Sequence, residues 1–278
     1  MKILPRLDLS GHTFVMGVLN VTPDSFSDGG RFLDKAKAVQ RALEIAREGA
    51  DIIDIGGEST RPGAGPVSAR EELTRVIPVI LAVSKKTCVP ISIDTMKAEV
   101  AEEAIRAGAS IVNDVSGLKH DKNMASVAAK YGVRLIVMHM KGTPKDMQLK
   151  PRYKDVVKDV IKDLKISIKT ARAAGVADEK IIVDPGIGFG KTFRHNLEIL
   201  NRLEEFKELK RPICVGVSRK SFIGKTLGIK DPEGRLIGTI AASVIAIMKG
   251  AGLIRVHDVK EAAQAVRMAD SILRPGAN

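Results

Sequence analysis

Polar side chains recur in this sequence directly after short apolar runs. PISIDT, SIVND, RLIVMHM and KIIVDPG each end this way. Carboxylates and amides at such points can read the edge of a nitrogen heterocycle, because they accept hydrogen bonds from a ring N–H and a neighbouring NH2 group. Pterins and guanines present such an edge. The residues at these run ends are Asp94, Asn113, Met138 and Asp184.

A flat ring also needs apolar walls, and Met138, Ile187 and Phe189 can supply them. Methionine in such a place is more often part of the core. A single acid after a strand can simply cap the next helix. Several polar groups around one opening are costly to bury unless a ligand or a neighbour satisfies them, so the set indicates a binding site.

The last two apolar runs lead into positive charge. PICVGVSRKS carries Lys220 and Ser221 before FIGKTLG, which is typical of a short helix whose N–H groups can hold an anion. Arg255 and His257 alternate in LIRVHD and therefore point to the same side of a strand. Barrels often hold phosphate near their seventh and eighth strands. These residues predict a phosphate or diphosphate site, with a core histidine as the alternative for His257.

Two loops are also candidates for chemistry. NVTPDSFSDGG, after the first run, offers oxygen ligands of the kind that Mg2+ prefers, or else a self-capping turn. GGESTRPG pairs Arg61 with the hydroxyl of Thr60, and a forked guanidinium suits carboxylate or phosphate; a solvated arginine is the alternative. The stretches 21–31, 58–67 and 141–152 exceed minimal turns, which favours functional loops.

Eight apolar runs alternate with stretches of helical periodicity, which predicts a (β/α)8 TIM barrel. The runs lack polar alternation, as expected of parallel strands covered on both faces. We expect one domain over 1–278, with a short hairpin or plug over 1–13; an open doubly wound sheet is the competing architecture. The expected helices cover 33–48, 68–85, 122–131, 153–174, 195–209, 234–249 and 259–273.

Two helix starts have specific signals. Ser68 with Glu71 three residues later predicts an N-cap, although Pro78 predicts a kink or a later start. Thr95, after the third run, is the expected cap of the following helix. Both starts lie where the chain must turn from a strand end into a helix.

The composition excludes several classes of protein. The net charge is +12, but lysine and arginine are scattered among acids, and aromatic residues make up 3% with no tryptophan, which argues against nucleic-acid binding. No apolar stretch approaches the roughly 20 residues of a membrane span, so we expect a cytoplasmic protein. Cys88 and Cys214 are expected to be buried reduced thiols, without a metal site.

Four motifs resemble the signatures of dihydropteroate synthases, the pterin-binding enzymes of folate biosynthesis. They are MGVLNVTPDSFSDGG at 16–30, GGESTRPG at 56–63, DPGIGFGK at 184–191 and SRKSFIG at 218–224, and the similarity spans nearly the whole chain. The resemblance implies condensation of 6-hydroxymethyl-7,8-dihydropterin diphosphate with 4-aminobenzoate, giving 7,8-dihydropteroate and diphosphate. It also implies Mg2+ and a homodimer.

The resemblance assigns roles to matching positions. The implied pterin-binding residues are Asp94, Asn113, Met138, Asp184 and Lys220. The implied diphosphate-binding residues are Arg255, Val256 and His257, with Asn20 acting through Mg2+. The residues implied for the second loop and the aminobenzoate pocket are Thr60, Arg61, Phe189, Lys220 and Ser221. The implied catalytic residues are Asp28, Asp94, Lys220 and Arg255.

Diphosphate would leave first, and a carboxylate such as Asp94 or Asp28 would stabilise the resulting cation. An arylamine is neutral at pH 7, so no strong base is needed. Three rivals remain: a methyltetrahydrofolate-corrinoid methyltransferase with a similar barrel, a Schiff-base aldolase using a strand-end lysine, and a nucleic-acid-binding barrel that uses the positive charge.

Overall fold

The computed structural model describes residues 11–22, 31–59, 63, 65–143, 146–149 and 151–275, and of residues 31–34 the backbone alone. Asp28, Thr60, Arg61 and most of the expected N-terminal hairpin lie outside these residues.

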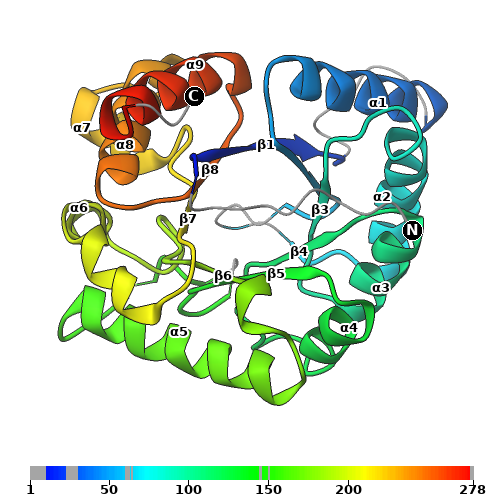
Figure 1. The fold of residues 1–278 in the computed structure, drawn as a ribbon, viewed down its shortest axis with the longest axis horizontal. Helices are drawn as coiled ribbons and strands as arrows, with labels where there is room; N and C mark the ends of the chain where they lie inside the picture. The colour runs from blue at the N-terminus through cyan, green and yellow to red at the C-terminus, as the bar shows by residue number, and fades with distance from the viewer. Residues whose placement is uncertain are drawn as a thin grey trace.

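Eight strands form one parallel sheet in the order β6-β5-β4-β3-β2-β1-β8-β7 (Figure 1). The two ends of this order meet through a parallel bridge between Val183 and Ile213. The bridge closes the sheet, so the predicted (β/α)8 barrel is confirmed and the open doubly wound sheet is wrong. The strands are β1 (Phe14–Asn20), β2 (Ile52–Gly56), β3 (Ile91–Asp94), β4 (Ile111–Asp114), β5 (Arg134–Met138), β6 (Ile181–Asp184), β7 (Cys214–Val215) and β8 (Leu253–Val256).

The helices surround the barrel, as Figure 1 shows. They are α1 (Arg31–Arg47), α2 (Ala69–Val83), α3 (Ala98–Ala107), α4 (Met124–Tyr131), α5 (Val156–Ala173), α6 (Phe193–Asn201), α7 (Ser221–Leu227), α8 (Leu236–Met248) and α9 (Val259–Leu273). Short 3-10 turns, η2 (Asp178–Lys180), η3 (Leu203–Leu209) and η4 (Glu233–Arg235), complete the order. The single helix expected over 195–209 is therefore wrong, because α6 ends at Asn201 and η3 follows.

The helix starts correct one expectation and confirm another. The Ser68 side chain accepts from the Glu71 N–H at 3.2 Å, and α2 continues through Pro78, so the later start is wrong. Thr95 does not cap α3: its hydroxyl accepts from the Lys97 N–H at 3.2 Å, and α3 begins one residue later. The Ala98 N–H instead donates to Asp121, from the loop after β4, at 2.9 Å.

The floor of the barrel is an apolar layer inside the strands. Successive side chains of a strand point to opposite faces, so every second residue points into the barrel. Together these residues form one buried cluster that fills the interior; its members are Phe14, Met16, Ile52, Ile111, Ile136, Ile182, Cys214 and Leu253. The packing of this layer aligns the strands below the residues at their carboxyl ends.

The intervening residues point outward and pack against the helices in the main core cluster. Packing is close over β1, at Gly17. A Cβ atom there would lie 2.4 Å from Cγ2 of Ile45 in α1 and 2.8 Å from Cγ2 of Val259 in α9. The first and last helices of the chain therefore meet over a strand position without a side chain.

Cys214 is buried and free, as expected, but Cys88 is exposed, so the expectation for that thiol is wrong. Cys88 lies in the turn before β3, two residues ahead of the buried Pro90. None of the described helices is long and apolar enough to cross a lipid bilayer.

Gly17→Ala tests this packing. We expect the free energy of unfolding to fall by about 1–3 kcal/mol, because the added methyl group overpacks the contact between α1 and α9. Urea denaturation measures the change. Gly11→Ala is the matched control, since a Cβ there meets nothing within 4 Å. Equal stability of the two variants would contradict the packing argument.

Candidate active site

A polar layer lies directly above the apolar floor of the barrel. Two residues after Ile52, Ile111 and Ile182, the same interior face carries a carboxylate or an amide. Because the strands are parallel, these side chains meet at the carboxyl end of the barrel. The buried members of this layer are Asp54, Asp94, Asn113, Met138 and Asp184, and Arg255 joins them from β8.

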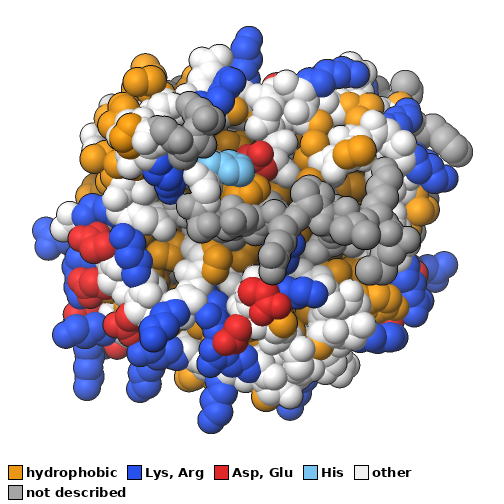
Figure 2. Space-filling model, in the orientation of Figure 1, with side chains coloured by type: hydrophobic (Ala, Val, Ile, Leu, Met, Phe, Trp, Pro, Cys, Tyr) orange, Lys and Arg blue, Asp and Glu red, His pale blue; other side chains and the backbone are white. Residues whose placement is uncertain are grey.

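The polar layer opens into a pocket. Figure 2 shows a hollow near the middle of this face, where a histidine and an acidic side chain are visible. The lining combines charged groups with one apolar wall, in which Phe189 packs against the Met138 and Val115 cluster. The lining residues are Asn113, Val115, Met138, Asp184, Phe189, Gly216, Ser218, Lys220, Arg255 and His257.

Arg255 is the electrostatic centre of the layer. Its Nε donates to Oδ2 of Asp54 and its Nη2 donates to Oδ2 of Asp94, each at 2.7 Å. Burial on its own lowers the pKa of Arg255, but the two carboxylates outweigh that effect and raise it. The guanidinium therefore stays charged and bridges β8 to β2 and β3.

Asp94 has a strongly raised pKa for an aspartate. Burial raises its pKa to about 7, against the opposing attraction of Arg255 and with a further contribution from Asp54. Its Oδ1 is buried and has no hydrogen-bond partner among the described residues. A buried acceptor without a partner is costly, so this oxygen is suited to receive an N–H from a bound molecule.

The loop after β7 brings Lys220 to the other side of the pocket. The Lys220 ammonium donates to the Ile187 carbonyl and lies 4.3 Å from the centre of the Phe189 ring. Burial lowers the pKa of Lys220 to about 8, although Asp184 favours the charged form. Asp184 itself accepts from the Gly186 N–H at 2.6 Å, and its pKa is raised by burial.

His257 occupies the rim beside β8. Its Nδ1 lies 3.1 Å from the Ser218 hydroxyl, which also accepts from the His257 N–H at 3.2 Å. This contact joins the ends of β7 and β8. The side chain of Val256 points the other way, into the core between strands and helices, so only its backbone can face a ligand.

The comparison with known proteins agrees with this geometry. Residues 16–257 match the family model of the pterin binding enzymes. The chain is 52% identical over 270 residues to the dihydropteroate synthase of Clostridium beijerinckii, covering 97% of each chain. The chain belongs to the dihydropteroate synthase family. It is therefore an enzyme of the transferase class.

Solved dihydropteroate synthases share the fold. The protein from Clostridium difficile, in the presence of pteroic acid, has a TM-score of 0.91 and 50% identity and covers 96% of this chain and 99% of its own. The protein from Xanthomonas albilineans, with 4-aminobenzoic acid, has a TM-score of 0.90 and 43% identity and covers 96% and 94%.

Most of the residues that the sequence predicted for the site lie together at the carboxyl end of the barrel. The structure brings together Asp94, Asn113, Met138, Asp184, Phe189, Lys220, Arg255 and His257. Ser221 is separate, because it is exposed at the first position of α7. Asn20 ends β1, next to β8, and is partly exposed.

Asp54 is a buried acid of this layer that was not predicted from the sequence. It lies inside ADIIDIGG, a mainly apolar run, and it is fully buried. The signal that would have found it is the spacing of two from Ile52, a floor residue. The same spacing separates Ile111 from Asn113 in β4.

A second missed feature is the buried ammonium of Lys191, from the DPGIGFGK motif. It lies 2.9 Å from Nδ1 of His139 and donates to the carbonyls of His139 and Phe189 at 3.3 and 3.0 Å. Burial lowers the pKa of both side chains, that of His139 to about 4. These bonds fasten the loop that carries Phe189 against the end of β5.

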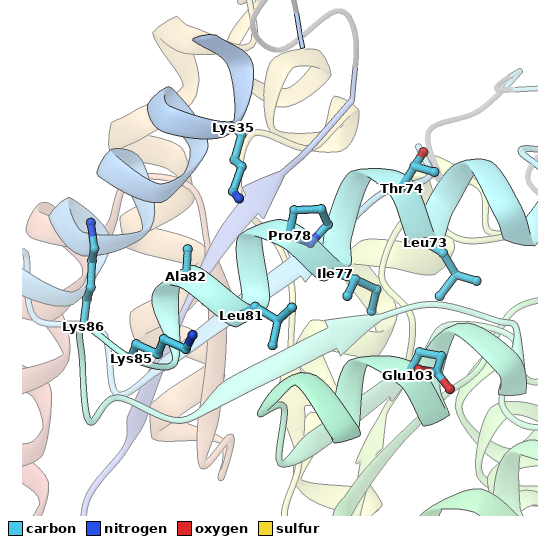
Figure 3. Close-up of a pocket in the computed structure, with 10 residues that line it drawn as sticks. All are labelled: Lys35, Leu73, Thr74, Ile77, Pro78, Leu81, Ala82, Lys85, Lys86 and Glu103. Atoms are coloured by element: carbon cyan, nitrogen blue, oxygen red, sulfur yellow. The ribbon is translucent and has the colours of Figure 1, made fainter. Parts of the chain in front are cut away.

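A separate groove lies on the outside of the barrel. Figure 3 shows it along α2, between α1 and α3, with Leu73, Ile77 and Leu81 flanked by Lys35, Lys85 and Glu103. None of the residues of the polar layer lines it. The groove is therefore separate from the pocket at the barrel mouth.

The raised pKa of Asp94 predicts that the free energy of unfolding depends on pH. Because the folded-state pKa of about 7 exceeds the ordinary value of 3.8, the folded protein holds a proton that the unfolded chain releases between these values. The resulting loss of stability is absent below about pH 4 and complete above about pH 7. We expect the stability of Asp94→Asn relative to wild type to rise by on the order of 4 kcal/mol from pH 4 to pH 8.

Urea denaturation at the two pH values measures this gain. Asp231→Asn, at an exposed carboxylate, is the control and should show no such difference. A pH-independent gap between wild type and Asp94→Asn would contradict the charge state assigned to Asp94.

Proposed function

We propose that the protein condenses 6-hydroxymethyl-7,8-dihydropterin diphosphate with 4-aminobenzoate to give 7,8-dihydropteroate and diphosphate. The observation that carries the proposal is a pocket with acceptors on one side and cations on the other, in a member of the dihydropteroate synthase family. Pteroic acid and 4-aminobenzoic acid accompany two of the similar structures, which supports the choice of substrates.

In this proposal the buried carboxylates bind the edge of the pterin ring. Asp184 and Asp94 accept from its ring N–H and amino groups, and the Asn113 amide completes the edge. The partnerless Oδ1 of Asp94 supports this role. The apolar wall of Met138 and Val115 covers one face of the ring.

The aminobenzoate takes the outer part of the pocket. Phe189 supplies an aromatic wall, and Lys220 beside it supplies charge for the carboxylate. Lys191 keeps this wall in place through the Phe189 carbonyl. Ser221, Thr60 and Arg61 complete the proposed contacts from the rim and from the second loop.

The diphosphate takes the side of β7 and β8. His257 and Arg255 face it, and the contact between His257 and Ser218 fixes the imidazole. Two N–H groups of Arg255 already hold Asp54 and Asp94, and the remaining donors of the guanidinium serve the anion. The backbone of Val256 lies between these two residues.

Mg2+ fits this side through Asn20. No group of three or more His, Cys, Asp or Glu side chains that could hold a metal occurs in the described part of the chain. Mg2+ commonly uses only one or two protein oxygens and completes its shell with substrate phosphates and water, so the Asn20 amide oxygen suffices. When bound there, the ion neutralises charge on the leaving diphosphate.

The reaction proceeds by departure and then attack. The bond between the methylene carbon and the diphosphate oxygen breaks, and its electron pair leaves with diphosphate, whose charge Arg255 and His257 stabilise. Asp94 or Asp28 stabilises the methylene cation; at about 4 Å and an effective dielectric near 20, this attraction is about 4 kcal/mol. The amine nitrogen then bonds to the carbon and loses a proton to solvent.

A diphosphate-release assay tests the proposal. We expect diphosphate only when both substrates are present, and we expect chelation of Mg2+ with EDTA to slow its release at least about tenfold. Dihydropteroate should appear in equal amount, as measured by chromatography. The rival methyltransferase, aldolase and nucleic-acid-binding readings all predict no diphosphate, so its absence with both substrates would refute the proposal.

We also propose that the protein forms a homodimer through α8 and its neighbours. Figure 2 shows hydrophobic side chains gathered over α7 and α8. Ile237 is 82% exposed, and Met248 and Met268 are more than half exposed. Contiguous apolar surface of this kind marks interaction sites, and a second copy can cover it symmetrically.

Ile237→Glu tests the dimer. We expect it to shift the protein to monomer in analytical ultracentrifugation, because a carboxylate cannot be buried unpaired at an apolar interface. Ile166→Glu, at an exposed isoleucine of α5, is the matched control and should sediment as wild type. A monomeric wild type, or an Ile237→Glu variant that remains dimeric, would contradict this interface.

A further inference from the structure

Asp54 ties three strands together through one oxygen. Its Oδ2 accepts from Nε of Arg255 at 2.7 Å and from Nδ2 of Asn113 at 3.2 Å. Asp54 belongs to β2, whereas its partners belong to β8 and β4, and neither of these strands is a neighbour of β2 in the sheet. It has no exposed surface and does not line the pocket.

The pairing of Arg255 in the fold does not explain why Asp54 is needed. Asp94 also accepts from Arg255, at 2.7 Å, so the guanidinium has two buried carboxylate partners. A second buried carboxylate adds a desolvation cost and repels the first. Asp54 in fact contributes to the raised pKa of Asp94. The second carboxylate therefore costs the fold stability, and its contact with Arg255 alone does not account for it.

The second carboxylate becomes useful when Asp94 binds a ligand. A pterin N–H that bonds to the free Oδ1 of Asp94 draws negative charge away from Oδ2 and so weakens the bond from Oδ2 to Arg255. Asp54 does not line the pocket and cannot be drawn away by the ligand. Its bond to Nε therefore holds Arg255 whichever partner Asp94 has.

We propose that Asp54 is a positioning residue, which holds Arg255 and Asn113 at the pterin pocket and keeps Arg255 anchored while Asp94 binds the ring. The inference rests on the proposed function, because it concerns the same pocket. It adds a residue from within β2 to the site.

Calorimetric binding of pteroic acid to the full chain tests the role directly. We expect Asp54→Asn to weaken binding at least about tenfold, because Arg255 and Asn113 lose their shared anionic acceptor. The KM for the dihydropterin diphosphate should rise with it, while the KM for 4-aminobenzoate at saturating pterin stays within about twofold. A merely structural role would not separate the two substrates.

A double-mutant cycle with Arg255→Ala asks whether Asp54 acts through Arg255. We expect Asp54→Asn to raise the KM for the dihydropterin diphosphate clearly less in the Arg255→Ala background than in wild type. Asp114→Asn is the matched control, because Asp114 is equally buried but bonds to Ser116 and Leu118 in the next loop. It should bind pteroic acid as wild type does.

Asp54→Glu covers the case in which Asp54→Asn does not fold. It keeps the charge but displaces the carboxylate by one methylene group, and we expect weaker pteroic acid binding in a folded protein. The inference is overturned if the folded variants bind as wild type, if the rise in KM is equal in both backgrounds, or if Asp114→Asn weakens binding to the same extent.

The wild-type protein separates this inference from the proposed function. Wild type that neither binds pteroic acid nor releases diphosphate overturns the proposed function and the inference with it. Wild type that does both, alongside an Asp54→Asn variant with unchanged pteroic acid affinity, overturns the inference alone.

Discussion

The guanidinium of Arg255 holds the charges of the barrel mouth together. Asp54 and Asp94 are buried in a region where an isolated carboxylate would be too costly to keep charged, and both bond to this one group. Burial, with a smaller contribution from Asp54, raises the pKa of Asp94, while Arg255 itself remains protonated. The charge states of the buried carboxylates therefore depend on whether each of them is bonded to Arg255.

The two-residue period of the strands connects stability to function. The same strand that supplies Ile182 to the floor supplies Asp184 to the pocket. The floor must therefore be correctly packed before the polar groups can be in register. A site assembled in this way is rigid at its base, and its variable parts are the loops and side chains above it.

Much of this could be predicted from the sequence. The repeat of strand and helix fixes the barrel class, and the polar residues at run ends mark the side of the site. Asp54 was missed because a lone acid inside an apolar strand does not reveal which face it occupies until the register is known. Thr95 was misjudged as a cap because a competing acceptor, Asp121, comes from another loop.

The contacts of Arg255 were also beyond the sequence. Its position on the inner face of β8 followed from alternation with His257, but its partners lie on β2 and β3, far away in the chain. Such long-range pairings depend on how the barrel closes. Periodicity along one strand carries no information about them.

The barrel is joined least extensively between β6 and β7. β7 has only two residues, and one bridge, between Val183 and Ile213, connects it to β6. Asp184 lies on one side of this seam and Lys220 on the other. A molecule bound by both residues would bridge the junction between β6 and β7. Part of its binding free energy would therefore stabilise this junction and make local opening of the barrel wall rarer.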